Sequence, residues 1–136
     1  MFSRFSPAAL RALRIAEQEC RNHNHYYVGA EHMLFALLEE RDPQVEAALR
    51  KERIPSNDVH AELKRALGMG EDRVWEGILI TPRLRNIIRA AEAQAGEREI
   101  EPIDLYDSIR AETGGLAAEI LARVSRNSKR PPEVAT

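Results

Sequence analysis

The sequence is poor in cysteine and lacks any long apolar run. One cysteine, Cys20, stands among 136 residues, so no internal disulfide can form. A single thiol favours a cytoplasmic setting. No window approaches the ~18 consecutive apolar residues of a membrane span, and the first ten residues lack the apolar segment of a secretory signal. We therefore expect a cytoplasmic protein without a membrane segment.

Aromatic residues are also scarce, and neither charge sign dominates. Aromatics make up 5% of the chain against 43% apolar residues in total, with abundant Ala, Leu, Glu and Arg, which favours helices over sheets. The 20 basic and 22 acidic residues are interspersed and give a net charge of −2. This balance gives no electrostatic case for a nucleic-acid partner.

The chain is organised around residues 26–38. Two tyrosines and a valine, which nucleate helices poorly, are followed by Gly29, and only good or tolerable helix formers come after it. A helix expected over residues 30–40 has an apolar face made of Met33, Leu34, Leu37 and Leu38. The pattern predicts an aromatic loop that leads into a buried helix.

Helix starts are marked by a capping residue followed by proline. This signature occurs at Ser6–Pro7, at Asp42–Pro43 and at Thr81–Pro82. A further helix is expected to be capped by Ser56 and to end at Gly68.

The pattern repeats after about 75 residues. At an offset of 75, Thr81 matches Ser6, and the matched pairs that follow are Leu13 with Ile88, Ala16 with Ala91 and Glu17 with Glu92. At an offset of 72, the pairs are Val28 with Ile100, Met33 with Leu105, Leu37 with Ile109 and Leu49 with Leu121. Two copies that each leave an apolar face uncovered would bury these faces against each other.

The second copy is shorter than the first. We divide the chain into a first copy at 1–68, a connector at 69–79, a second copy at 80–125 and a disordered tail at 126–136. No counterpart of the helix after Ser56 follows Ser125. Trp75, in the connector, is expected to pack this strap onto the core, and the alternative is an anchor that faces a partner.

Three segments resemble a known family. Residues 2–7 (FSRFSP), 27–38 (YVGAEHMLFALL) and 80–83 (ITPR) resemble the tandem Clp repeat of the N-terminal domain of ClpC/ClpA-type AAA+ unfoldases. The resemblance implies an all-α domain of two pseudo-twofold-related, four-helix-type repeats packed as one compact unit, with the second repeat truncated. In the family this domain sits on an ATP-driven ring of the Clp protease system and receives adaptor proteins and substrates.

The implied role is binding without catalysis. The chain contains no phosphate-binding G-x-x-x-x-G-K-[ST] loop, and we expect no cofactor and a monomer in isolation. One alternative is a free-standing protein that acts as an adaptor, decoy or accessory regulator of the Clp machine. Another is a small helical enzyme or nucleic-acid binder, but that reading needs a catalytic constellation or a basic face, and neither is visible.

Glu31 is the first candidate binding residue. The resemblance implies that, in some ClpC-type relatives, glutamates at this place contact the guanidinium of phosphorylated arginine. A carboxylate pairs bidentately with guanidinium, although an acid in a first helical turn is also favourable without any ligand. The matching place in the second copy is Ile103, with Asp104 beside it, so two such sites are not expected.

An apolar seam is the second candidate. Phe2 and Ile80 are expected to line it where the N-terminus meets the second copy, with Arg83 and Arg85 at its rim, because relatives bind peptides at that seam. Apolar side chains bordered by arginines are typical of protein-binding surfaces. Phe5 is equally explained as a core residue.

A metal site and a catalytic thiol find little support. His23 and His25 form a potential chelating pair and His32 lies nearby, but no thiolate or carboxylate cluster with zinc spacing accompanies them. Cys20 lies on the apolar face of the first helix and is best explained as a small buried side chain. We therefore predict neither metal ligands nor catalytic residues.

Overall fold

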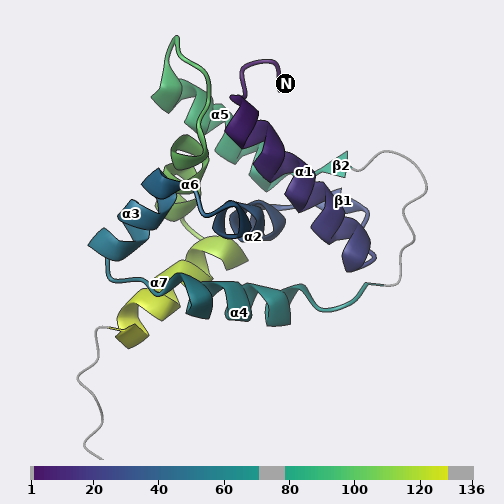
Figure 1. The fold of residues 1–136 in the computed structure, drawn as a ribbon. Helices are drawn as coiled ribbons and strands as arrows, with labels where there is room; N and C mark the ends of the chain where they lie inside the picture. The colour runs from purple at the N-terminus through teal and green to yellow at the C-terminus, as the bar shows by residue number, and fades with distance from the viewer. Residues whose placement is uncertain (1, 71–78, 129–136) are drawn as a thin grey trace, which may run out of the picture.

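The computed structural model describes residues 2–70 and 79–128. Figure 1 shows helices packed around a central helix, with two short strands at one edge. The elements in these ranges are, in order, α1 (Pro7–Asn22), β1 (Tyr27–Val28), α2 (Ala30–Glu40), α3 (Pro43–Lys51), α4 (Ser56–Leu67), β2 (Leu79–Ile80), α5 (Pro82–Ala95), α6 (Pro102–Ala111) and α7 (Leu116–Ser128). The predicted all-α class is confirmed.

The three cap-and-proline signatures start helices as predicted. Ser6 Oγ accepts a hydrogen bond from the Ala9 N–H at 3.1 Å, and Thr81 Oγ1 accepts one from Leu84 at 3.1 Å. Asp42 accepts from two N–H groups of α3. The prediction that Ser56 caps α4 is wrong. The Asp58 and Val59 N–H groups donate to the Pro55 carbonyl, so the helix starts one residue earlier and Ser56 lies inside it.

Helix α2 forms the centre of the core. It packs against α1, α4, α5, α6 and α7 (Figure 1). Its predicted apolar face, which includes Met33 and Leu37, is buried, and so are Phe35 and Ala36 on the remaining circumference. A helix that is apolar all round belongs in the middle of a helical core, so the predicted organising role of this stretch is confirmed.

At two junctions, a backbone segment of the first half of the chain pairs with one of the second half. Strand β1 pairs in parallel with β2, and the Thr81 N–H donates to the Val28 carbonyl at 3.0 Å. At the other junction, Phe5 bridges Ile100 in parallel and the Ser6 N–H donates to the Ile100 carbonyl at 2.9 Å. Since Ser6 matches Thr81 and Val28 matches Ile100 in the repeat, the two junctions are equivalent.

The C-terminal boundary differs from the prediction. Helix α7 continues to Ser128, so residues 126–128 are helical rather than part of a disordered tail. The Ser128 hydroxyl donates to the Arg53 carbonyl at 2.6 Å, and this contact ties the last turn to the end of α3. Trp75 and residues 129–136 lie outside the described residues, and the remaining division into copies stays a prediction.

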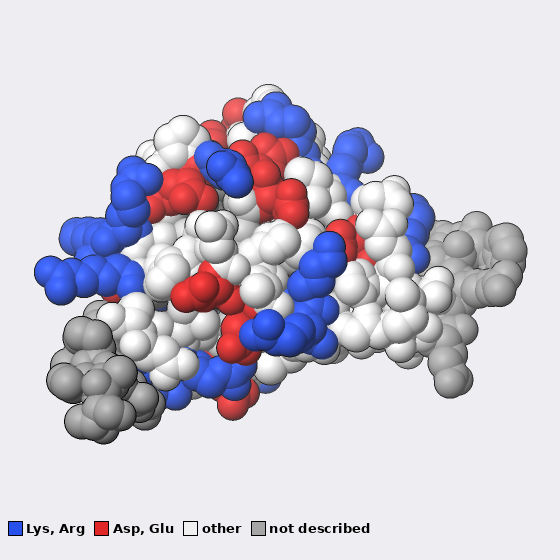
Figure 2. All heavy atoms as spheres, turned by 60° about the horizontal axis from the view of Figure 1, so that its bottom comes forward, with Lys and Arg blue, Asp and Glu red and all other residues white. Residues whose placement is uncertain are grey.

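The surface has mixed charge. Figure 2 shows acidic and basic side chains interspersed on one face of the molecule. In the ranges 2–70 and 79–128, none of the helices has the length and apolar content of a bilayer-spanning segment.

Candidate functional site

A pocket of about 300 Å³ lies where the first turns of α2 and α5 meet, beside β1. We call it the junction pocket. Its lining comes from both halves of the chain and includes Tyr27, Glu31, His32, Leu67, Thr81 and Arg83. The β1–β2 pairing fixes the two helix starts relative to each other, so this pocket depends on the packing of one half on the other.

Glu31 offers a free carboxylate to this pocket. The side chain is partly exposed in the first turn of α2. It makes no hydrogen bond or ion pair with any other described residue. A Cβ added at Gly29 would lie 2.7 Å from Glu31 Oε2, so the absence of a side chain at Gly29 leaves room for the carboxylate. Glu31 is therefore placed to accept hydrogen bonds from a cationic ligand.

Arg83 also lines the pocket and carries a positive charge. Its Nη1 lies 3.5 Å from Glu112 Oε2 and 3.4 Å from the Gly114 carbonyl oxygen, in the segment between α6 and α7. A Cβ at Gly115 would lie 2.9 Å from Arg83 Nη1, so Gly115 gives the guanidinium space to cross the backbone. Because the Glu112 pair is long and exposed, it holds Arg83 only weakly.

Three histidines support the wall of the pocket. His32 Nδ1 accepts the Gly29 N–H at 3.0 Å, which leaves the proton of the neutral ring on Nε2, 2.8 Å from His25 Nδ1. Burial, and after it the nearby His25 and His23, lower the pKa of His32 to about 4. The ring is therefore neutral at pH 7.

The histidine rings do not converge on a common point. His23 and His25 stack with ring centroids 5.8 Å apart, and His23 Nε2 lies 2.7 Å from Glu19 Oε1. His23 Nδ1 bonds the Gly68 carbonyl oxygen. Within residues 2–70 and 79–128, no group of three histidine, cysteine, aspartate or glutamate residues is arranged to hold a metal ion.

Cys20 has a structural environment. Its side chain is buried, and its Sγ donates to the Tyr27 carbonyl at 3.0 Å. Burial, reinforced by the charge of Glu17, raises the pKa of the thiol to about 12. A thiol held in its protonated form is a poor nucleophile.

The structure does not bring Phe2 and Ile80 together. The side chain of Arg4 bonds the Gly96 and Arg98 carbonyl oxygens, so the N-terminus lies at the C-terminal end of α5. Ile80 precedes the N-terminal end of the same helix, and 14 residues of helix span about 21 Å. The physical reason for this separation is that Phe5 pairs with Ile100, which follows α5, and not with Ile80, which precedes it.

The residues predicted for the seam lie at either the C-terminal or the N-terminal end of α5. Phe2 packs edge-on against Phe5 at a centroid distance of 5.3 Å, and Phe5 is buried in the core. Ile80 is partly buried. Arg83 and Arg85 follow it on α5, where Arg85 is exposed and has no partner among the described residues. Ile80 directly precedes Thr81, which lines the junction pocket, and it lies at the other end of α5 from Phe2.

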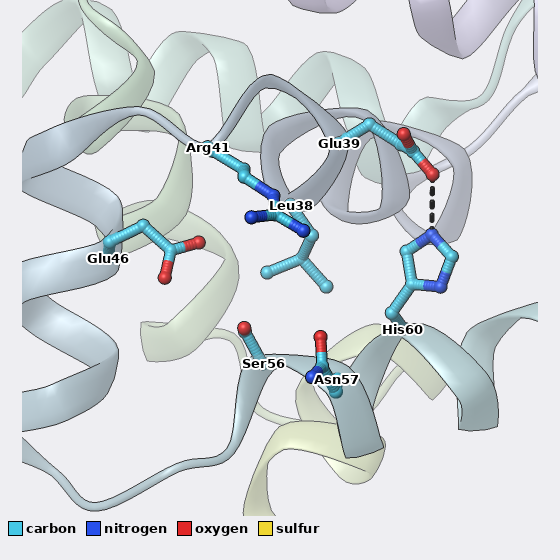
Figure 3. A pocket seen from close by; sticks show the side chains of 7 residues that line it. All are labelled: Leu38, Glu39, Arg41, Glu46, Ser56, Asn57 and His60. Atoms are coloured by element: carbon cyan, nitrogen blue, oxygen red, sulfur yellow. Dashed lines mark hydrogen bonds and ion pairs between the residues drawn. The ribbon is translucent and has the colours of Figure 1, made fainter.

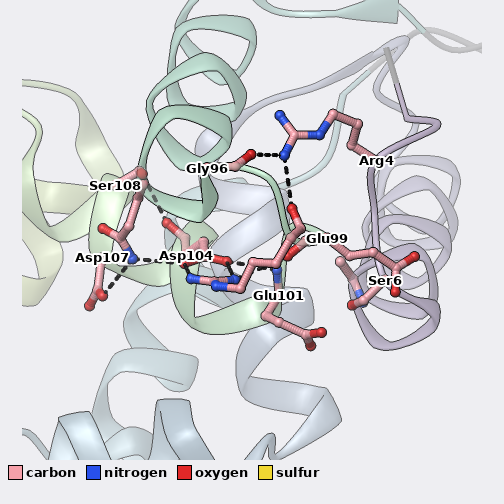
Figure 4. Close-up of polar contacts among 11 residues, drawn as sticks. Arg4, Ser6, Gly96, Glu99, Glu101, Asp104, Asp107 and Ser108 are labelled. Atoms are coloured by element: carbon pink, nitrogen blue, oxygen red, sulfur yellow. Dashed lines mark hydrogen bonds and ion pairs between the residues drawn. The ribbon is translucent and has the colours of Figure 1, made fainter.

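The second copy replaces the histidine contact with an ion pair (Figure 4). Asp104 is fully buried at the place that matches His32, and Arg98 binds it through two bonds of 2.6 and 2.7 Å. Burial alone would raise the pKa of Asp104, but Arg98, the Glu101 N–H and Gln94 together hold it below its usual range. Sequence reasoning missed this pair because Arg98 lies in a loop without a periodic pattern.

Sequence reasoning also missed most of the pocket wall. Thr81 could have been found, since it matches Ser6 in the repeat. Leu67 and Leu116 reach the pocket only through packing of α4 and α7, and no local signal marks them.

A family model described as "Clp repeat (R) N-terminal domain" matches residues 4–104. The chloroplastic chaperone protein ClpC of Pisum sativum is 28% identical over 124 residues, which cover 89% of this chain and 13% of the relative. An ATP-binding subunit ClpA homolog of the Clp protease from Porphyra purpurea is 27% identical over 128 residues, 92% of this chain and 16% of the relative. The chain thus spans only a small part of the length of these relatives.

Solved structures show the same fold. The N-terminal domain of the caseinolytic protease associated chaperone ClpD from Arabidopsis thaliana superposes with a TM-score of 0.66 at 18% identity, covering 94% of this chain and 96% of that one. A chain from a structural study of a malarial protein secretion system gives a TM-score of 0.73 at 13% identity, covering 90% and 85% of the two chains.

Proposed function

Because the chain belongs to the Clp repeat N-terminal domain family, we propose that it binds adaptor proteins or protein substrates of a ClpC-like unfoldase and carries out no catalytic step itself. The observation that carries the proposal is the unpaired carboxylate of Glu31 in the junction pocket. A polar group that faces a pocket without an internal partner is available to a ligand.

The ligand we propose for this pocket is a phosphorylated arginine of a partner protein. Its guanidinium would pair with the Glu31 carboxylate, and its phosphate would approach Arg83, whose present ion pair is long and exposed. Charges of both signs in one pocket suit a ligand that carries both. Because Ile103 stands at the matching place of the second copy, we expect one such site in the chain.

The seam residues extend this surface. Ile80, Arg83 and Arg85 lie at the start of α5, next to the pocket, and would contact the flanking residues of a bound peptide or adaptor. Phe2 would belong to a second contact area at the far end of α5, reached only by a partner larger than a short peptide.

Calorimetric titration with a phosphoarginine peptide and its unmodified twin, both amidated at the C-terminus, tests the proposal. We expect the marked peptide to bind and Glu31→Gln to weaken it by about 10-fold or more, since a charge-assisted pair is lost. Glu119→Gln, in the first turn of α7, is the matched control and should change nothing. Equal binding of the two peptides, or an unaffected Glu31→Gln variant, would remove the phosphoarginine role.

A further inference from the structure

A second hollow lies at the other end of α2, between α2, α3 and α4 (Figure 3). Its volume is about 320 Å³, and Leu38, Arg41, Glu46, Ser56 and Asn57 line it together with Glu39 and His60. We call it the α2–α4 hollow. Glu31 and Arg41 stand at opposite ends of α2, and 11 residues of helix span about 16 Å. The hollow is therefore distinct from the junction pocket.

Four polar side chains converge on the hollow without binding one another. Arg41, Glu46, Ser56 and Asn57 make no side-chain hydrogen bond or ion pair with any described residue. Figure 3 shows these groups around Leu38, with the Arg41 guanidinium above it. The remaining polar pair is closed, because His60 Nε2 lies 2.6 Å from Glu39 Oε1. Polar groups that face a pocket without an internal partner are available to a ligand.

Arg41 stands at a backbone position that does not favour arginine. It follows the last turn of α2 with a φ of 52°. Glycine adopts this left-handed conformation at lower cost than a residue with a Cβ. Glycine would fill the position at lower backbone cost, and the arginine, whose charge also suits a helix C-terminus, brings a guanidinium to the hollow.

The balance of free groups favours a carboxylate ligand. The guanidinium, the Ser56 hydroxyl and the Asn57 amide supply donors, whereas Glu46 is the one charged acceptor left unpaired among the lining residues that the structure describes. Glu46 also disfavours a bare multivalent anion, but it can accept a peptide N–H next to a single carboxylate.

We propose that the α2–α4 hollow binds the C-terminal residue of a partner polypeptide. The terminal carboxylate takes the Arg41 guanidinium, with Ser56 and Asn57 as further donors. Glu46 accepts the last peptide N–H. Capture of a chain end by convergent donors is a recurring mode of peptide recognition.

The test is a nitrogen–proton NMR titration of the whole chain with an N-acetylated hexapeptide that ends in leucine with a free carboxylate. Its C-terminal amide is the matched ligand. We expect saturable shifts at Arg41, Ser56 and Asn57 with the free acid and about 10-fold weaker binding of the amide. Arg41→Gly should weaken binding of the free-acid peptide to the same degree. Because glycine suits the backbone at this position, the variant should fold.

Arg53→Gly is the control variant. Arg53 also follows a helix with a positive φ, 58°, and its side chain has no partner among the described residues. It should leave peptide binding unchanged. Equal affinity for acid and amide, no saturable shift at millimolar peptide, or an unaffected Arg41→Gly variant overturns the proposal. Binding of a peptide with a free N-terminus and an amidated C-terminus, but not of the acetylated acid, would also overturn it.

Discussion

At the scale of single residues, His32 and Asp104 serve the same purpose with different chemistry. Each stands at the third position of its helix and accepts the N–H of the residue before that helix, Gly29 at 3.0 Å and Glu101 at 2.8 Å. The first half of the chain does this with a neutral ring that hydrogen-bonds His25, and the second half with a carboxylate paired to Arg98. The bond from the third side chain of the helix to the preceding N–H is retained in both halves, whereas the charge of the accepting side chain differs.

His32 should make the stability of the fold depend on pH. Its pKa falls from 6.5 to about 4 on folding, so the unfolded chain binds more protons between these two values. Stability is then complete above pH 6.5 and is lost as the pH falls toward 4, by up to about 3 kcal/mol. Urea unfolding of the wild type and of His32→Gln at pH 7 and pH 4.5 measures this contribution.

Glutamine is the appropriate replacement because it can still cap the Gly29 N–H but does not titrate. We expect the variant to lose less stability than the wild type between the two pH values. Identical losses in the two proteins would show that His32 contributes nothing to the pH dependence.

At the scale of elements, Asp104 joins α5, the following loop and α6. It accepts from Gln94 of α5 at 2.9 Å, from Arg98 of the loop and from the Glu101 N–H at the start of α6 (Figure 4). One buried carboxylate therefore fixes the angle at which α6 leaves the loop. The same turn carries Ile100, whose pairing with Phe5 closes one of the two equivalent junctions.

Asp104→Ala should be strongly destabilising. It leaves the Glu101 N–H without its side-chain acceptor and removes one of the two acceptors of the Gln94 amide, at a cost of about 2–4 kcal/mol. Denaturant unfolding measures this loss, and a double-mutant cycle with Arg98→Ala tests the pair. Once Asp104 is alanine, removing Arg98 should cost little, because the arginine keeps only its bond to the Glu99 carbonyl oxygen. Additive losses would mean that the two residues act independently.

The sequence predicted α2 well in position and incompletely in burial. Its bounds, residues 30–40, were found from Gly29 and the apolar spacing, and the structure gives Ala30–Glu40. The prediction assigned one buried face, whereas Phe35 and Ala36 are buried as well. Local periodicity shows which residues share a face, but it does not show how many neighbours surround a helix.

At the scale of the whole molecule, the exchanged pairings make the two halves interdependent. Helix α2 of the first half packs on α5, α6 and α7 of the second, and each junction joins segments from both. The repeat was visible in the sequence because matched residues keep their spacing. The pairing between the halves was not visible, since the spacing of matched residues does not show which copy a segment pairs with. For this reason the sequence placed Phe2 beside Ile80, whereas the structure separates them.

A fragment of residues 1–70 should therefore not fold alone. It would expose the sides of α2 that the second half covers, and two strand partners would be missing. We expect poor dispersion in its NMR spectrum and no cooperative unfolding transition. Adding a fragment of residues 71–136 should restore both. A well-dispersed spectrum of the first fragment alone would show that the halves are independent domains.

The central claim is that one junction pocket, at the start of α2, receives the ligand. Its most direct test is a nitrogen–proton NMR titration with the phosphoarginine peptide, amidated at its C-terminus so that it does not bind the α2–α4 hollow. We predict saturable shifts at residues 29–32 and 81–84, with one peptide bound per chain and no shifts at 101–104, where Arg98 already occupies Asp104. Saturable shifts confined to residues 101–104, or the same shifts with the unmodified peptide, would contradict the account.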